Sequence, residues 1–275
     1  MVLSGHDPFN SIQAMRIVIA GGSRGIGKAL AEHFQERGDE TWVLARNSAT
    51  PCDVADWSQV AAARDAVAAK WDSVDAVICA AAIQGAVGPA MSADPARWSE
   101  TVRVNLDGTF FMIRAFWDLL RRSPQRGKIV CFSGGGATKA RANFSAYAAS
   151  KTAVVRLVEN LANEWHSLPV DINAIAPGAI TTDMTRETVA RGPEIVGRAE
   201  HEAAQRQLES GGQSVDRAIG LVEWLLSEQS DGVTGRLLSA QWDDWDNLSA
   251  SREKLAETDV FQLRRIIAKE RSLEF

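Results

Sequence analysis

The sequence has 275 residues, of which 45% are hydrophobic and 24% are charged, and its formal net charge is −5. This composition is typical of a globular protein and excludes the clustered surplus of Lys and Arg that a nucleic-acid surface requires. It also excludes a membrane span, because no apolar run approaches the roughly 18 residues that a span needs. We expect residues 1–14 to form a flexible leader, since they lack the continuous apolar core of a secretory signal. The three scattered cysteines, Cys52, Cys79 and Cys131, fit reduced thiols in a cytoplasmic protein.

Short apolar runs rich in β-branched residues alternate along the chain with longer segments of helical periodicity. This alternation predicts an α/β fold, in which a doubly wound, mostly parallel sheet of seven strands is covered by helices on both faces. We expect strands at 16–20, 41–45, 50–52, 76–80, 128–133, 171–175 and 235–240, and helices at 26–37, 57–71, 97–121, 146–166 and 214–228. No linker divides the chain, so residues 15–241 are expected to form one domain. An insert at 183–213 interrupts it, and an extension at 242–275 is expected to pack on the domain or on a neighbouring subunit.

A glycine-rich turn joins the first expected strand to the first expected helix. It reads Gly21-Gly22-Ser23-Arg24-Gly25-Ile26-Gly27. Glycines at such a turn let the backbone approach a pyrophosphate, whose charge is met by the free amides at the start of the helix. Many tight turns between a strand and a helix bind nothing. The placement of this one favours a dinucleotide site in a Rossmann-like domain.

Two arginines bear on which dinucleotide is bound. The second strand ends in Leu44-Ala45-Arg46-Asn47 and offers no acidic residue for the ribose hydroxyls of NAD. Arg46 and Arg24 can instead clamp the 2′-phosphate of NADP, so NADP(H) is the preferred cofactor and NAD(H) the second option. The alternative is a pair of solvated surface arginines. Asp53, after the third strand, is expected either to accept a hydrogen bond from an adenine amino group or to serve as a turn or cap residue.

A tyrosine and a lysine lie four residues apart at the start of a predicted helix, in Tyr147-Ala148-Ala149-Ser150-Lys151. This spacing puts the phenol and the ammonium on one helix face. A phenol with an ordinary pKa near 10 needs about 4 kcal/mol of preferential stabilisation of the phenolate to exchange protons near pH 7. An adjacent lysine and a cationic nicotinamide ring can supply it. The pattern alone is common and usually structural, but Tyr147 is the only tyrosine in the chain.

With these motifs, residues 15–241 resemble the classical short-chain dehydrogenases/reductases (SDRs). The pattern Gly21-x-x-x-Gly25-x-Gly27 matches the cofactor turn of that family, and Tyr147-x-x-x-Lys151 matches its catalytic pair. The resemblance implies that Tyr147 is the general acid/base and that Lys151 binds the nicotinamide ribose and lowers the tyrosine pKa. It further implies that Asn105 supports a water in the proton relay. It also implies a homodimer or homotetramer, formed through the helices at 97–121 and 146–166.

The resemblance extends to two further parts of the cofactor site. The segment 173–182, which contains Pro177 and Gly178, is similar to the family segment after the sixth strand. There the backbone of Ile180 would bond the nicotinamide carboxamide, and Thr182 would reach the carboxamide or the pyrophosphate. After the fourth strand the family usually has Asn-Asn-Ala-Gly beside the cofactor, whereas this chain has Cys79-Ala80-Ala81-Ala82. Ala80 and Ala81 occupy the corresponding positions, but the side-chain amides that brace the central sheet and the cofactor pocket in the family are missing.

The carbonyl-orienting serine of the family usually lies thirteen residues before the tyrosine, where this chain has Gly134. Ser133 lies one residue earlier. A bulge in the permissive backbone of Gly134-Gly135-Gly136 would carry its hydroxyl into the usual place. The alternative is a serine that caps the strand end and never meets substrate. Ser145 is a second candidate for the role.

The sequence therefore predicts a cytoplasmic NAD(P)-dependent oxidoreductase that transfers a hydride between NADP(H) and a small carbonyl or secondary alcohol substrate. A non-catalytic dinucleotide-binding sensor is the alternative, which the displaced serine and the run from Cys79 to Ala82 favour. The insert at 183–213 is expected to form a substrate lid. Its arginines either admit an anionic substrate or belong to a solvated charged helix, the preferred interpretation; they are Arg186, Arg191, Arg198 and Arg206. We expect no metal, nucleic-acid or membrane partner.

Overall fold

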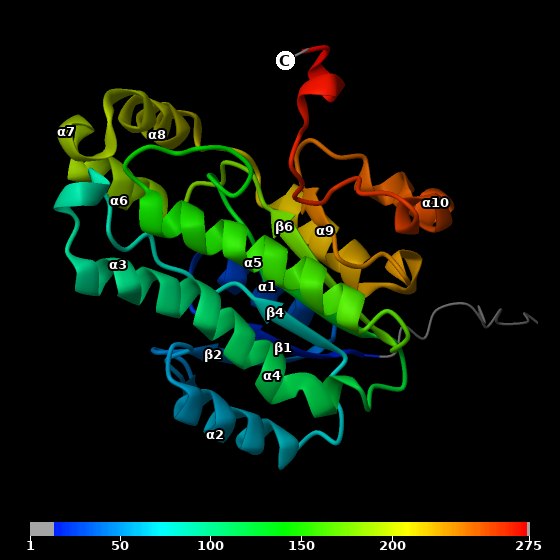
Figure 1. Ribbon diagram of the computed structural model, residues 1–275. Helices are drawn as coiled ribbons and strands as arrows, with labels where there is room; N and C mark the ends of the chain where they lie inside the picture. Colours follow the sequence, from blue (N-terminus) through cyan, green and yellow to red (C-terminus); the bar gives the residue numbers. More distant parts are fainter. Residues whose placement is uncertain (1–13, 274–275) are drawn as a thin grey trace, which may run out of the picture.

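The computed structural model describes residues 14–273 and places seven parallel strands in one sheet, in the order β3-β2-β1-β4-β5-β6-β7 (Figure 1). The strands are β1 (Arg16–Ala20), β2 (Glu40–Ala45), β3 (Thr50–Pro51), β4 (Ala76–Cys79), β5 (Gly127–Phe132), β6 (Val170–Ala176) and β7 (Leu237–Ser239). All six neighbouring pairs are parallel. The predicted α/β class and seven-stranded sheet are therefore confirmed. The expected leader lies, apart from Ala14, outside the described residues.

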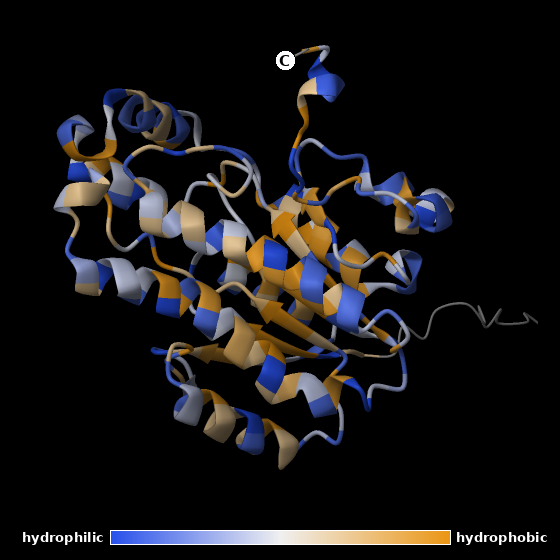
Figure 2. Cartoon of the chain, in the orientation of Figure 1, coloured by the Kyte–Doolittle hydropathy of each residue, from blue (hydrophilic) through white to orange (hydrophobic). Residues whose placement is uncertain are grey.

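Helices cover both faces of this sheet (Figure 1). They are α1 (Gly25–Glu36), α2 (Trp57–Ala68), α3 (Pro95–Val102), α4 (Gly108–Leu120), α5 (Ser145–Glu164), α6 (Asp183–Arg191), α7 (Pro193–Val196), α8 (Arg198–Ser210), α9 (Asp216–Leu226) and α10 (Arg252–Ala256). The helices α2, α4 and α5 pack on one face, and α1 and α9 pack on the other. Figure 2 shows the most apolar residues concentrated on the strands between these two layers.

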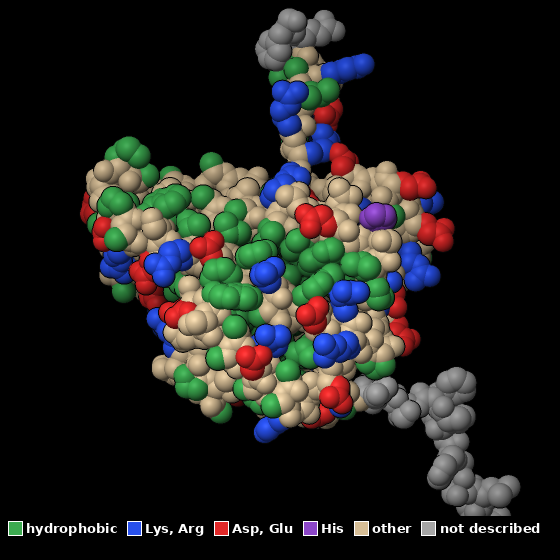
Figure 3. Space-filling view, turned by 60° about the horizontal axis from the view of Figure 1, so that its bottom comes forward, with side chains coloured by type: hydrophobic (Ala, Val, Ile, Leu, Met, Phe, Trp, Pro, Cys, Tyr) green, Lys and Arg blue, Asp and Glu red, His purple; other side chains and the backbone are tan. Residues whose placement is uncertain are grey.

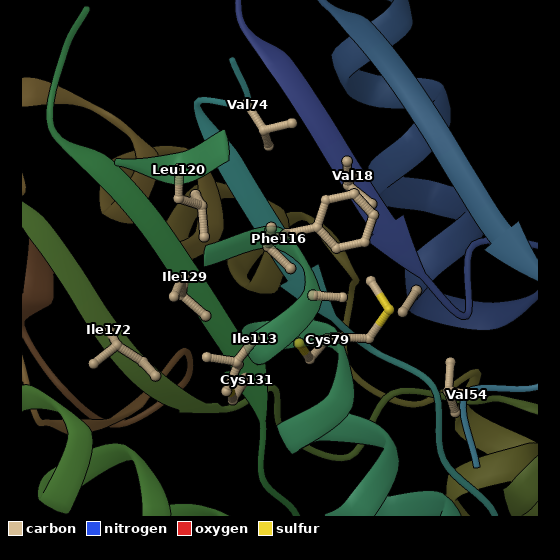
Figure 4. Close-up of a cluster of buried hydrophobic side chains, with 14 of the residues drawn as sticks. Val18, Val54, Val74, Cys79, Ile113, Phe116, Leu120, Ile129, Cys131 and Ile172 are labelled. Carbon is tan, nitrogen blue, oxygen red and sulfur yellow. The ribbon is translucent and has the colours of Figure 1, made fainter. Parts of the chain in front are cut away.

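The two faces are filled by alternate residues of each strand, because successive side chains of a strand point to opposite sides. On the α4 side, Val18 and Ile129 pack with Phe116 in a fully buried cluster (Figure 4). On the α1 side, the neighbouring residues Ile17 and Val130 join a second cluster. Burial on both sides explains why the strand sequences read as nearly continuous apolar runs.

One predicted helix is divided in the structure. The expected helix at 97–121 is α3, then a π-helical turn (Arg103–Asp107), then α4. The side chain of Asn105 in this turn forms hydrogen bonds with the backbone of Ile83, in the loop after β4. Gly108, directly after the turn, packs closely against Val54. A π turn is a single wide turn within an otherwise α-helical segment, too short for the helical periodicity of the sequence to locate.

The predicted insert, residues 183–213, forms the helices α6, α7 and α8, and its two ends are joined. Ile180 forms an antiparallel bridge with Gly212, and the amide of Gln213 donates to the carbonyl of Ala179. The last strand, β7, is shorter than the expected 235–240, although Gly235 and Arg236 before it already form backbone hydrogen bonds with Ile172 and Ala174 of β6. The insert therefore leaves and rejoins the domain at one place beside β6.

The C-terminal extension packs on its own domain as far as Leu263. The buried guanidinium of Arg236 donates to the carbonyls of Leu255, Thr258 and Val260 at 2.6 to 2.8 Å. Arg264 and Arg265 still lie beside α5, and the C-terminal end of the described chain, red in Figure 1, stands away from the body of the molecule. Backbone carbonyls thus satisfy a buried cation, which fixes the first part of the extension.

The surface is mixed in character. Figure 3 shows apolar side chains spread across the face turned forward, with Lys and Arg among them. Phe110 of α4 and Trp57 of α2 are 39% and 41% exposed. Across residues 14–273, no helix combines the length and the apolarity of a membrane span.

Candidate active site

A cavity of about 1020 Å³ opens at the carboxyl ends of the strands. It is bordered by the β1–α1 turn, the end of β2, the segments after β4, β5 and β6, and the lid. The strand order changes direction between β1 and β4, and in doubly wound sheets ligands bind at such a switch point. The position of the cavity follows from the topology.

The glycine turn brings two backbone segments into close contact. The amide of Gly21 donates to the carbonyl of Leu44 at 2.8 Å, and a Cβ at Gly21 would stand 2.5 Å from the amide nitrogen of Ala81. Helix α1 begins at Gly25 without a side-chain cap. Its first amides therefore lack side-chain partners beside the cavity, where an anion would be stabilised by them and by the helix dipole.

The two predicted phosphate-binding arginines both border the cavity. The Arg24 side chain lies 3.7 Å from a carboxylate oxygen of Asp183 on α6, and both side chains are half exposed. Arg46 is exposed at the end of β2, and within residues 14–273 it forms no ion pair. Asp53 also borders the cavity, but one of its oxygens accepts from the amide of Ala55 at 3.0 Å, as its turn interpretation predicts.

Tyr147 and Lys151 lie on the buried face of α5. The Lys151 ammonium is 5.8 Å from the centre of the Tyr147 ring and donates to the carbonyl of Phe132 at 2.7 Å. Burial lowers the pKa of Lys151 to about 8. Cys79 and Cys131 are free, buried thiols that lie opposite each other on β4 and β5, and they weakly oppose this lowering of the Lys151 pKa. Lys151 is thus a buried cation held at a desolvation cost, and unlike Tyr147 it is not among the residues that border the cavity.

The pKa of Tyr147 reflects burial and one nearby positive charge of the protein. Burial raises the pKa of this phenol above its ordinary value, and the positive charge of Arg141 opposes the rise. The Lys151 ammonium, on the same helix, donates its hydrogen bond to the carbonyl of Phe132 and not to the phenol. The protein groups alone therefore favour the neutral phenol.

Ser133 is not carried outward by a bulge. Its amide donates to the carbonyl of Ile175 at 2.8 Å, which continues the regular ladder between β5 and β6. Its hydroxyl is buried and has no partner within the described chain. Gly134 occupies the position at which the family usually has its carbonyl-orienting serine, and a Cβ there would stand 2.5 Å from the Tyr147 hydroxyl. Ser145 accepts from the Trp98 indole at 3.1 Å.

Asn105 braces the loop after β4. Its amide group exchanges two hydrogen bonds with the backbone of Ile83, at 2.9 and 3.0 Å, and donates a third to the Ser150 hydroxyl. Ala80 and Ala81, which precede this loop, border the cavity. The side chain of Asn105 thus ties the loop to α5, which bears Tyr147.

The segment after β6 also borders the cavity. It contributes Pro177, Gly178, Ile180 and Thr182, and Thr182 is the N-cap of α6. The four arginines of the insert do not border the cavity. Arg186 and Arg206 pair with acidic residues of the insert itself and are mostly exposed. This arrangement agrees with the solvated charged helix that the sequence favoured.

Sequence reasoning missed an ion pair in the cavity wall. Arg141, between β5 and α5, donates to Glu200 of α8 at 2.7 and 3.1 Å. The guanidinium carbon also lies 3.8 Å from the centre of the Phe144 ring. No local pattern marks Arg141, because its partner lies 59 residues away on the lid.

Comparisons with known proteins point in one direction. The family model described as short chain dehydrogenase matches residues 15–192. The chain is 28% identical over 243 residues to levodione reductase of Leifsonia aquatica, covering 81% of this chain and 91% of that protein. It is 26% identical over 279 residues to short chain dehydrogenase tazN of Aspergillus terreus. That match covers 94% of this chain and 58% of the length of tazN.

A solved structure is similar in fold. It is the ligand-free aldohexose dehydrogenase of Thermoplasma acidophilum, with a TM-score of 0.73 and 25% identity. The match covers 82% of this chain and 92% of that one. The match therefore extends over most of the sheet and its helices.

Proposed function

This chain belongs to the short-chain dehydrogenase family, and from that premise we propose that it transfers a hydride between NADP(H) and a carbonyl or secondary alcohol substrate. In this proposal Tyr147 is the general acid/base. The observation that carries it is that Tyr147 and the glycine turn border the same cavity. A phenol positioned this way can exchange a proton with a substrate that also meets a dinucleotide.

The residues present fit a dinucleotide. Gly21 lets the turn pack against the backbone of Ala81, and the amides at the start of α1, which have no side-chain cap, can meet a pyrophosphate. The remaining contacts are assigned by resemblance to Ser23, Arg24, Gly25, Ile26, Gly27, Arg46, Asp53, Ala80, Ala81, Tyr147, Lys151, Pro177, Gly178, Ile180 and Thr182. The NADP preference rests on Arg46 and Arg24. Both guanidiniums reach the cavity, and a 2′-phosphate would compete with Asp183 for Arg24.

The bound cofactor supplies or accepts the hydride, and the chain manages the proton. During reduction the Tyr147 hydroxyl donates its proton to the substrate oxygen as negative charge develops there. The Lys151 ammonium, next to the Phe132 carbonyl, would bind the nicotinamide ribose. Asn105 holds the loop and α5 in register through its bonds to Ile83 and Ser150. These contacts fix the phenol before the substrate arrives.

Ser133 is the candidate for the carbonyl-orienting hydroxyl. A buried hydroxyl without a partner costs about 1–3 kcal/mol, so a substrate oxygen within its reach would gain a hydrogen bond at no competing loss. Because the ladder through Ser133 is regular, the hydroxyl would reach substrate by side-chain rotation and not through a bulge.

The remaining parts of the proposal follow from the family and from the residues. Residues 183–213 act as the lid over the substrate, and residues 15–241 form the catalytic domain. The three free, buried cysteines suit a reducing compartment such as the cytoplasm. A homodimer or homotetramer would cover apolar surface such as that of Phe110 on α4.

The test is Tyr147→Phe, assayed with NADPH and a panel of aldehydes and ketones. Turnover should fall by roughly 10²- to 10⁴-fold because the proton donor is lost. NADPH affinity, measured by quenching of tryptophan fluorescence, should stay within a few fold because the ring remains. An active Phe variant would refute the role of Tyr147. Tight NADPH binding by the wild type with no cofactor oxidation across the panel would favour a sensor instead.

A further inference from the structure

Arg141 is an ordered cation in the wall of the cavity. It lies on the loop between β5 and α5, and its side chain is 19% exposed. Its guanidinium packs on Phe144, which is fully buried and belongs to a small apolar cluster with Tyr147 and Val196. Stacking on an aromatic ring restricts a guanidinium to one plane. The orientation of Arg141 is therefore set before any ligand is present.

Only one edge of this guanidinium is occupied by the protein. Nε and Nη2 of Arg141 donate to the same carboxylate oxygen of Glu200, at 3.1 and 2.7 Å. Nη1 makes no hydrogen bond within residues 14–273. A guanidinium carries five N–H donors in a rigid fork, so three remain unused by Glu200, and two of these point from the edge formed by Nη1 and Nη2. This edge is free for an oxygen acceptor.

The free edge and the Tyr147 hydroxyl border two consecutive glycines. A Cβ on Gly134 would stand 2.5 Å from the Tyr147 hydroxyl, and a Cβ on Gly135 would stand 3.7 Å from Nη1 of Arg141. Neither glycine has a side chain to fill the space beside these groups. Because consecutive α-carbons are about 3.8 Å apart, a small molecule can span the distance between the two positions.

We propose that Arg141 is a specificity-determining residue, which binds an oxygen acceptor that the substrate carries a few bonds away from its reacting carbonyl. A carboxylate is the best ligand, because it can take two charge-assisted hydrogen bonds from the free edge. A hydroxyl or second carbonyl offers the same chemistry without the charge. Glu200 is a positioning residue that holds the opposite edge. The inference rests on the proposed function, since it assigns a substrate class to the same cavity.

The experiment uses three substrates of equal chain length: a plain ketone, the corresponding hydroxy-ketone and the corresponding keto acid. Steady-state kinetics with saturating NADPH compare the wild type with Arg141→Met, Arg141→Lys and Glu200→Gln. In Arg141→Met we expect kcat/KM for the acceptor-bearing substrates to fall roughly 10- to 100-fold, mainly through KM, as for a lost charge-assisted hydrogen bond. The plain ketone should lose much less, about threefold or under, because it loses no hydrogen bond and only the Arg141 charge 6.0 Å from the centre of the Tyr147 ring is removed.

The other variants separate binding from structure. Arg141→Lys keeps the charge but loses the fork, so it should recover only part of the loss. Glu200→Gln should lower kcat/KM for the same acceptor-bearing substrates by a smaller factor. Lys139→Met is the matched control, because Lys139 is an exposed cation of the same loop and cavity, and it should leave the selectivity unchanged.

The keto acid and the hydroxy-ketone distinguish a carboxylate from a neutral oxygen as the acceptor that Arg141 binds. A large effect on the keto acid alone identifies a carboxylate, and equal effects on the keto acid and the hydroxy-ketone identify a neutral acceptor. Equal losses for all three substrates in Arg141→Met, or a loss of selectivity in Lys139→Met, would overturn the proposal. If the wild type turned over none of them, the proposed function would fail instead. Calorimetric binding of the keto acid to the wild type and to Arg141→Met would then decide the role of Arg141, with weaker binding by the variant expected.

Discussion

The substitution Lys151→Met should remove one contribution to the pH dependence of the free energy of unfolding, the contribution that comes from the titration of Lys151. Lys151 is fully buried in α5, and its ammonium has one protein acceptor, the carbonyl of Phe132 at 2.7 Å. Burial lowers its pKa from 10.5 to about 8. Methionine has a similar length and no charge, so the substitution removes the titration and keeps most of the packing.

The sign follows from proton binding in the two states. Between pH 8 and 10.5 the unfolded chain holds the proton of Lys151 and the folded chain releases it, so the free energy of unfolding of the wild type rises with pH. At 1.36 kcal/mol per pKa unit, the fall to about 8 corresponds to about 3 kcal/mol. Below pH 8 the lysine is charged in both states, and the wild type carries the whole desolvation penalty.

Urea unfolding at pH 7, 8, 9 and 10, at one protein concentration, measures this difference. At pH 7 the free energy of unfolding of the Met variant should exceed that of the wild type. The removed desolvation penalty contributes up to about 3 kcal/mol to this difference, and the lost hydrogen bond to Phe132 lowers it by about 1 kcal/mol. The difference between the proteins should then shift by about 3 kcal/mol in favour of the wild type by pH 10.5. Groups that do not interact with Lys151 titrate alike in both proteins and cancel. A difference that stays constant from pH 7 to 10 would refute the reasoning.

Three further substitutions test the cavity. Gly21→Ala should abolish NADPH binding in a fluorescence titration, because a Cβ there would stand 2.5 Å from the Ala81 amide. Gly38→Ala has a comparable positive φ but no atom within 4 Å of its Cβ, so it should bind normally. Arg46→Glu should lower the ratio of kcat/KM for NADPH to that for NADH by about tenfold or more, as for a lost ion pair with phosphate; an unchanged ratio would remove Arg46 from the phosphate site. Gly134→Ser restores the family serine in sequence but crowds the Tyr147 hydroxyl, so kcat should fall, and a rise would contradict the geometry.

The features that the sequence could predict are local ones. Strand runs such as RIVIA report burial on both faces, and the glycine turn from Gly21 to Gly27 follows its strand directly. The spacing of Tyr147 and Lys151 fixes a shared helix face wherever the helix lies. Fold class and the framework of the candidate site therefore follow from residues a few positions apart.

The features that it could not predict depend on contacts between distant segments. The π turn at Arg103–Asp107 reflects the attraction of Asn105 for Ile83, 22 residues earlier. The Arg141–Glu200 pair joins the β5–α5 loop to a lid helix whose position no pattern fixes. The regular ladder at Ser133 depends on its pairing with Ile175. In each case tertiary packing selected one of several local options.

The environment of Tyr147 bears on the direction of the proposed reaction. Burial raises the pKa of the phenol, the charge of Arg141 opposes the rise without cancelling it, and the Lys151 ammonium is turned to the carbonyl of Phe132. A neutral phenol is the proton donor with which carbonyl reduction begins, whereas alcohol oxidation begins with the phenolate acting as base. At neutral pH the protein groups therefore hold Tyr147 in the protonated form with which carbonyl reduction begins. Since the phenolate becomes more populated as pH rises, the rate of alcohol oxidation should increase through the alkaline range while the rate of reduction does not.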